Sequence, residues 1–166
     1  EPLSALDPFL RIRMRGELKK LQKELGISFI HVTHGQDEAL ALADEIVVMN
    51  DAVIEQAGAA RDVFNAPKTR FVAQFMGGHN VIALPDGHFA IRTDAVAITA
   101  AQKGTLDAQV TAVEYQGTHV SVQSRITGDQ EVTALVPEAE YFTTPHHPGD
   151  RIGLRWDAKN LHQLTA

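Results

Sequence analysis

The sequence predicts an α+β chain in which an incomplete α/β segment precedes a small all-β barrel or sandwich. Helix-like and strand-like segments alternate through the first 77 residues, an order typical of α/β sheets. Beyond Gly77-Gly78, short stretches of alternating apolar and polar residues are separated by turn sequences rich in Gly, Pro and Asp. The first part has too few strands for a complete α/β domain. We therefore expect two domains, residues 1–77 and residues 78–166.

The first predicted element is a helix that begins at Asp7-Pro8. Aspartate is a favoured N-cap, and proline is favoured at the first helical position. Apolar residues then recur at steps of three and four, which predicts one apolar face; they are Leu10, Met14, Leu18, Leu21 and Leu25. Gly26 is a natural C-terminal stop. The opposite, basic face is interpreted as solvated.

Short elements follow this helix. We expect Ile27–Thr33 to form a buried strand, because it is rich in β-branched and aromatic residues. A helix, a hairpin with its turn at Asn50-Asp51, and two further helices are predicted next; they cover residues 36–43, 45–49, 53–56, 59–65 and 69–76. Seven strands are predicted in the second part; they cover residues 81–84, 88–91, 96–99, 106–115, 119–126, 131–136 and 151–156.

Composition excludes several classes of protein. The chain has 15 Lys and Arg against 21 Asp and Glu, a net charge of −6 that argues against a dedicated nucleic-acid binder. It has no cysteine, so disulfide frameworks and thiolate metal sites are excluded. No apolar run approaches the ~20 residues that span a bilayer. Because the sequence lacks a starting Met and a signal peptide, we expect a soluble fragment whose N-terminus lies upstream.

Two sequence motifs point to one chemistry. The chain opens Glu1-Pro2-Leu3-Ser4-Ala5-Leu6-Asp7, and a histidine ends the strand-like sequence Val32-Thr33-His34. Together they resemble the second half of an ABC-transporter ATPase. The resemblance implies that Glu1 ends the Walker B strand and is the general base for the water that attacks the γ-phosphate of ATP.

The same resemblance assigns roles to the turn and to the histidine. It makes Ser4, Ala5, Leu6 and Asp7 the D-loop, which crosses the interface between two nucleotide-binding subunits, although Asp7 also suits a helix N-cap. It makes His34 the switch histidine, which contacts the γ-phosphate and orients the catalytic carboxylate. His31 is interpreted as structural.

The chain departs from the family in four respects. Gly35 stands where the family commonly has Asp. Ala52 stands where the hairpin usually has Gly, so we expect Asn50 or Asp51 to take the left-handed conformation instead. No phosphate loop of the form G-x-x-x-x-G-K-[ST] and no Leu-Ser-Gly-Gly-Gln signature is present. We therefore predict that this chain alone is inactive, whereas the intact protein uses ATP and Mg²⁺.

The rest of the sequence resembles one group of importers. Residues 58–77 are similar to the helical connector of the sugar, polyamine and iron group. Asn80, Arg92 and the closing residues 149–162 resemble the accessory TOBE domain, which is built on an OB-like barrel. The resemblance implies the ATP-hydrolysing subunit of a bacterial importer of polyamine, iron or thiamine type. It implies a homodimer that works with permease subunits and, indirectly, a solute-binding protein, in the cytoplasm at the inner face of the membrane.

Three alternatives were weighed. The chain could be a non-enzymatic OB-like module that binds a small ligand. Single-strand nucleic-acid binding is disfavoured, because only 6 Lys and Arg lie beyond residue 77. A metal site at His146-His147, with His119 and Glu138 or Glu140, is also disfavoured, because adjacent side chains on an extended chain point in different directions. We predict no metal site.

Overall fold

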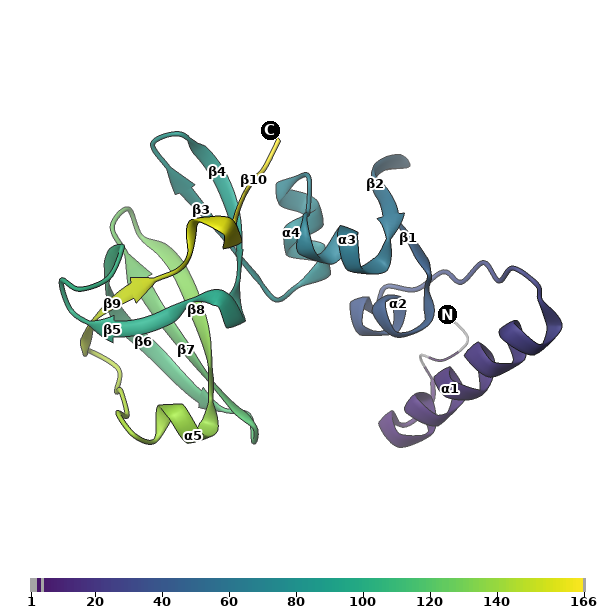
Figure 1. Ribbon diagram of the computed structural model, residues 1–166, viewed down its shortest axis with the longest axis horizontal. Helices are drawn as coiled ribbons and strands as arrows, with labels where there is room; N and C mark the ends of the chain where they lie inside the picture. Colours follow the sequence, from purple (N-terminus) through teal and green to yellow (C-terminus); the bar gives the residue numbers. More distant parts are fainter. Residues whose placement is uncertain (1–2, 4, 166) are drawn as a thin grey trace. The chain divides into compact units, whose positions relative to one another are not determined.

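The computed structural model describes residues 3 and 5–165, so the predicted residues Glu1 and Ser4 lie outside the described part. The chain forms two compact units, Glu1–Phe64 and Asn65–Ala166 (Figure 1). No described helix is both long enough and apolar enough to cross a membrane.

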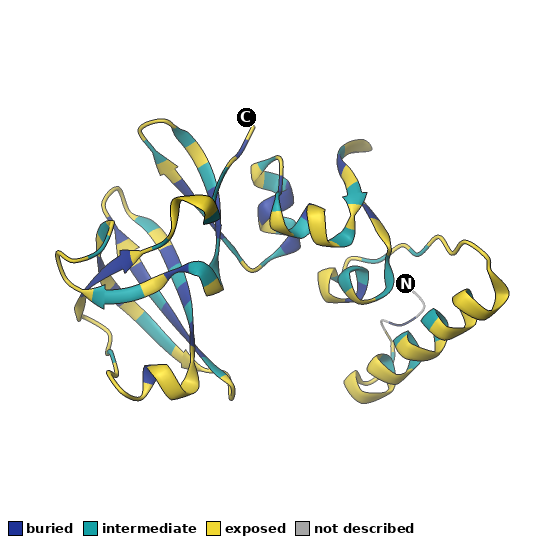
Figure 2. Cartoon of the chain, viewed as in Figure 1, coloured by how far each residue is buried: buried dark blue, intermediate teal, exposed yellow. Residues whose placement is uncertain are grey.

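The first unit begins with helix α1, Pro8–Leu25, as predicted. The Asp7 carboxylate accepts hydrogen bonds from the backbone N–H groups of Phe9 and Leu10, each at 3.0 Å. Gly26 ends the helix in the left-handed conformation, with φ of 62°. None of the residues of α1 is buried, so its apolar face is exposed or half-buried (Figure 2).

A short helix and a hairpin follow. Helix α2 spans Gln36–Leu42, strands β1 (Glu45–Asn50) and β2 (Val53–Ala59) pair antiparallel, and helix α3 spans Ala60–Asn65. Asp51 takes the left-handed conformation as predicted, with φ of 47°. The expectation that it would do so in place of Ala52 is wrong, because Ala52 also has a positive φ, 64°. A two-residue hairpin turn of this kind requires positive φ at both central residues.

The predicted strand Ile27–Thr33 is not formed. These residues have no regular secondary structure, and Ile30 and Val32 are 97% and 71% exposed. A strand needs a neighbour to satisfy its backbone groups, and the described sheet of this unit contains only β1 and β2. The composition of the segment suits a strand, but the described part of the chain supplies no partner for it.

The second unit is mostly β-structure, and its strands all pair antiparallel. One sheet has the order β10-β4-β3, and the other has the order β5-β9-β6-β7-β8. The strands are β3 (His79–Leu84), β4 (Gly87–Arg92), β5 (Ala97–Ala100), β6 (Leu106–Tyr115), β7 (His119–Ile126), β8 (Gln130–Pro137), β9 (Arg151–Arg155) and β10 (Leu161–Gln163). All seven predicted strands are confirmed, and β10 was not predicted.

Short helices complete this unit. They are α4 (Arg70–Met76), η1 (Thr93–Ala95), α5 (Glu138–Tyr141) and η2 (Ala158–Asn160). Helix α4 packs through Ala73 on Ala90 and Leu164, in a small buried cluster. Arg92 donates to the Asn65 side chain at 2.8 Å. Through these contacts, residues 65–76 belong to the same compact unit as the β-strands. The domain boundary at residue 77 remains a prediction.

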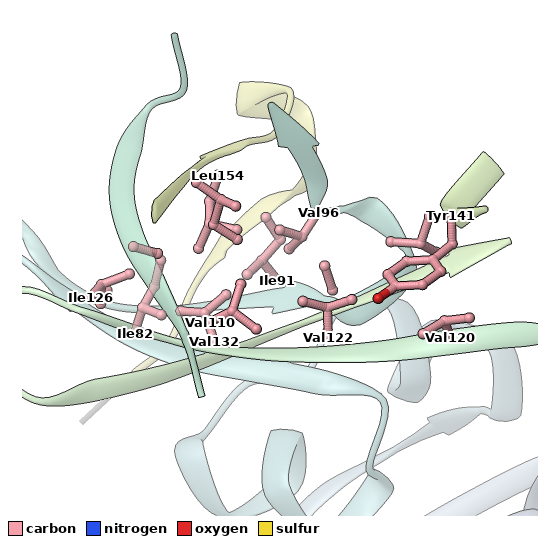
Figure 3. Packing of buried hydrophobic residues seen from close by; sticks show 14 residues of the cluster. Ile82, Ile91, Val96, Val110, Val120, Val122, Ile126, Val132, Tyr141 and Leu154 are labelled. Carbon is pink, nitrogen blue, oxygen red and sulfur yellow. The ribbon is translucent and has the colours of Figure 1, made fainter. Parts of the chain in front are cut away.

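The main apolar core of the second unit is separate from this small cluster. Figure 3 shows its side chains converging from the strands of both sheets, with Val110, Val122, Val132 and Leu154 each at most 2% exposed. The Asn80 side chain also joins β3 to β8. It donates to the Thr133 carbonyl at 2.8 Å and accepts from the Thr133 N–H at 2.7 Å. Asn80 thus supplies bonds of the kind that a neighbouring strand would make.

Candidate functional site

Polar side chains surround the start of helix α2, where the chain carries His34. The Thr33 hydroxyl accepts a hydrogen bond from the Gly35 N–H at 2.9 Å and donates one to Glu38 Oε2 at 2.5 Å. His34 lies between Thr33 and Gly35, in a bend, and its side chain is exposed. The exposed imidazole therefore lies between Thr33, whose side-chain hydroxyl is hydrogen-bonded, and Gly35, whose backbone is hydrogen-bonded.

The carboxylate of Glu38 is buried behind this loop. The residue is 6% exposed, and its Oε1 lies 3.2 Å from His31 Nε2. Burial raises the pKa of Glu38, but the hydrogen bond from the Thr33 hydroxyl and the nearby His31 ring together outweigh burial, so the net shift lowers the pKa. Glu38 is therefore an ionised, buried group at neutral pH.

An ion pair ties the start of α2 to α1. Arg15 Nη2 lies 2.7 Å from Asp37 Oδ2, and the hydrogen bond from Arg15 is the main reason that the pKa of Asp37 is lowered. Asp37 is 69% exposed, so the pair is weakly stabilising by itself. The pair joins the first turn of α2 to the middle of α1.

The turn before α1 carries the other predicted site residues. Leu3 is 4% exposed, and its carbonyl accepts from the Leu6 N–H at 3.2 Å. Arg11 donates to the Leu6 carbonyl at 3.0 Å. Ala5 and Asp7 are exposed, and Asp7 caps α1 as described above. Its capping role is confirmed, whereas the interface role of the turn and the catalytic role of Glu1 remain predictions.

The chemistry available at this loop is that of an imidazole. His34 is exposed there, and an imidazole can donate a hydrogen bond to an anionic oxygen.

The second unit contains a cavity of about 530 Å³ at the edges of its larger sheet. Edge strands β5 and β8 line it, together with Glu140, Tyr141 and His146. The histidines of the disfavoured metal hypothesis have separate neighbours. The His146 ring packs on Tyr141, while His147 Nδ1 lies 3.8 Å from Asp150 Oδ2.

Sequence reasoning missed the contacts that fix the histidine loop. From the sequence, Thr33 is recognised only as part of Val32-Thr33-His34, and neither the role of Glu38 nor the ion pair between Arg15 and Asp37 is predicted. One signal was available, because a glutamate in the first turn of a short helix often accepts hydrogen bonds from the preceding loop. The burial of that glutamate depends on tertiary packing and was not readable from the sequence.

Parts of this chain are similar to known proteins. Residues 89–164 match the family model of the TOBE domain. The chain is 36% identical over 164 residues to the spermidine/putrescine import ATP-binding protein PotA of Bacillus thuringiensis (strain Al Hakam), an alignment that covers 96% of this chain and 50% of the relative. It is 39% identical over 176 residues to the protein of the same name from Borreliella afzelii (strain PKo), covering 87% of this chain and 51% of the relative.

The chain thus spans about half the length of the curated relatives it matches. Among solved structures, the cytoplasmic molybdate-binding protein ModG, with molybdate bound, superposes with a TM-score of 0.41 and 17% identity. That likeness covers 45% of this chain and 57% of the other, and it is too weak to carry an argument.

Proposed function

We propose that this chain is the C-terminal part of an ABC-importer ATP-binding subunit that hydrolyses ATP to energise solute uptake in a bacterium, since residues 89–164 match the TOBE domain and 96% of the chain aligns at 36% identity with an import ATP-binding protein. The names of its relatives favour a polyamine as the solute over iron or thiamine. The single observation that carries the proposal is the 36% identity to an import ATP-binding protein over 96% of this chain. Within the chain, we propose that His34, which is exposed in the loop before α2, is the switch histidine.

The proposed reaction uses two residues of this chain. Glu1 accepts a proton from water as the water oxygen bonds to the γ-phosphorus and the bond to the bridging oxygen of ADP breaks. His34 donates a hydrogen bond to a γ-phosphate oxygen and orients Glu1. Mg²⁺ would neutralise phosphate charge when bound, and the carboxylate that holds it in the family precedes Glu1, outside this sequence.

The partners and the location follow from the same proposal. Ser4, Ala5, Leu6 and Asp7 would cross to a second copy of the subunit, which completes the ATP site. The dimer would act on transmembrane permease subunits, and through them on a solute-binding protein, at the inner face of the cell membrane. Residues 1–77 would be the remainder of the P-loop ATPase domain, and residues 78–166 the accessory barrel. Without a phosphate loop, this chain alone would not turn over ATP.

Two substitutions in the intact subunit test this proposal. Glu1→Gln should preserve ATP binding and nearly abolish turnover, because the amide keeps the shape but cannot accept the proton. His34→Ala should lower kcat by about a hundredfold or more, because one oriented contact to the transition state is lost. His147→Ala is the control, since its side chain is 78% exposed in the other unit. Near-normal hydrolysis in both Glu1 and His34 variants would overturn the proposal.

The cavity in the second unit favours a second candidate, a module that binds a small ligand. Its volume of about 530 Å³ lies within the range of ~300–1,000 Å³ typical of small-molecule sites. Titration of the 166-residue chain with spermidine or putrescine, followed by calorimetry, tests it. Saturable binding that Tyr141→Ala abolishes would support this candidate, and no heat at millimolar ligand would exclude these two ligands.

A further inference from the structure

Glu38 is buried and charged, and the proposed reaction does not use it. Two acceptor oxygens of this residue face the loop that carries His34. Its Oε2 accepts from the Thr33 hydroxyl at 2.5 Å, and its Oε1 lies 3.2 Å from His31 Nε2. Burying a carboxylate is costly unless the charge is paired and hydrogen-bonded, and both contacts of Glu38 are made with residues just before His34.

The contacts of Glu38 bracket the position of His34 in the chain. Thr33 precedes His34 and connects two groups, since it accepts from the Gly35 N–H and donates to Glu38. Gly35 follows His34, and its surroundings are tight, because a Cβ there would lie 3.4 Å from Thr33 Oγ1 and 3.3 Å from Asp37 Oδ1. The Thr33 side chain and the Gly35 backbone are therefore both held, on either side of the exposed imidazole.

An ordinary helix cap does not account for this arrangement. Gly35 is the N-cap of α2 and provides no side chain, so Glu38 occupies the third helical position. In a capping box, a glutamate at that position accepts directly from the N-cap N–H. Here the Gly35 N–H bonds to Thr33 instead, and Glu38 is reached only through the Thr33 hydroxyl. The route through Thr33 includes the residue next to His34, which a capping box does not require.

We propose that Glu38 is a positioning residue that acts through Thr33 to hold His34 in the geometry needed to contact the γ-phosphate. This inference rests on the proposed role of His34. It predicts that loss of the Thr33 hydroxyl or of the Glu38 carboxylate disturbs the oriented contact without removing any group that binds ATP. The effect should therefore appear in kcat and not in KM.

The test uses the intact subunit and two matched pairs of variants. Thr33→Val keeps the side-chain shape and removes the hydroxyl, whereas Thr33→Ser keeps the hydroxyl. Glu38→Ala removes both acceptors, whereas Glu38→Gln keeps one. We expect Thr33→Val and Glu38→Ala to lower kcat by roughly ten- to a hundredfold, the range expected for misplacement of a catalytic contact by about 1 Å. KM should change by less than about threefold, and the conservative variants should recover most of the activity.

A double-mutant cycle separates positioning from general destabilisation. If Thr33 acts through His34, Thr33→Val should have no further effect on kcat in a His34→Ala background, because the group it positions is gone. Full additivity of the two substitutions, or wild-type kcat in both Thr33→Val and Glu38→Ala, would overturn the inference. If His34→Ala alone keeps normal turnover, the proposed function fails, and this inference fails with it. If Thr33→Val does not fold, the comparison of Glu38→Gln with Glu38→Ala decides.

Discussion

The two units of this chain differ in how far their apolar side chains are buried. Of the fifteen large hydrophobic residues that are exposed in the described part of the chain, thirteen lie in the first unit and only Tyr115 and Phe142 lie in the second. The main core of fourteen buried residues lies wholly in the second unit. Figure 2 shows the contrast as long exposed stretches on α1 and buried strands in the two sheets. The second unit encloses its own core, and the first unit leaves most of its large apolar side chains exposed.

The physical reason for the difference is strand pairing. The first unit has one two-stranded sheet, and an isolated hairpin is at best marginally stable in water. In the second unit, four of the eight described strands have a neighbour on each side, in sheets of three and five strands. The difference fits the proposal that the first unit is part of a larger ATPase domain and the second is an accessory domain.

Of the substitutions that test this difference between the units, the one that overpacks the second unit at Gly153 should have the largest effect on stability. A Cβ on Gly153 would lie 2.6 Å from Thr99 Oγ1 and 2.7 Å from the Ala100 carbonyl oxygen, where β9 meets β5. We expect Gly153→Ala to lower the free energy of unfolding of the second unit by about 3 kcal/mol. Fluorescence of Trp156, the one tryptophan of the sequence, follows this unit during urea unfolding.

Gly16→Ala is the matched control in the first unit. Nothing lies within 4 Å of a Cβ at that position, and it is in the interior of α1. Helix propensity predicts a gain of ~1 kcal/mol for α1 and no change in the Trp156 transition. An unchanged unfolding midpoint in Gly153→Ala would contradict the close packing of β9 against β5 at this glycine.

Breaking the side-chain bridge of Asn80 should have the next largest effect. Asn80→Ala removes two hydrogen bonds to the Thr133 backbone and leaves a partly buried N–H and C=O without these partners. We expect a loss of ~2 kcal/mol in the free energy of unfolding of the second unit. Gln163→Ala is a mild control, because its side chain makes one exposed hydrogen bond at 3.4 Å. An equal loss in both variants would contradict the role assigned to Asn80.

Lowering the pH should destabilise the loop before α2 in the first unit. The folded-state pKa of Glu38 is lowered from its ordinary value of 4.5, so its stabilisation is present above that value and is lost as the pH falls through the folded pKa. Amide hydrogen exchange at Gly35, corrected for intrinsic rates, should therefore speed up below about pH 4.5. Glu38→Gln should remove this pH dependence. A wild-type profile in that variant would assign the effect to another group.

Much of the second unit could be predicted from the sequence, and less of the first. Alternating patterns between Gly-, Pro- and Asp-containing turns identified seven strands, because a half-buried strand and its turns leave local signals. Strand β10, Leu161–Gln163, is too short for such a pattern. The error at Ile27–Thr33 has a different cause. Its residues favour a strand, but pairing depends on what lies beside it, which composition does not report.

The candidate site likewise has features that could be predicted from the sequence and features that could not. The cap at Asp7 and the stop at Gly26 are local and were predictable from residue type. His34 was identified through a resemblance, since a lone histidine before a helix has no special meaning by itself. The contacts of Thr33 and Glu38 depend on how the loop folds back on α2 and required the structure.

Hydrogen exchange of the intact subunit gives the most direct test of the central claim, that the first unit holds the ATP-hydrolysing chemistry and the second is accessory. The Glu1→Gln variant should be compared with and without Mg-ATP, so that nucleotide binds without turnover. Exchange across residues 31–38 should slow on binding, while exchange in β6, β7 and β9 stays unchanged. The account would be contradicted if residues 31–38 were unaffected and protection appeared instead around the cavity lined by β5, β8 and Tyr141.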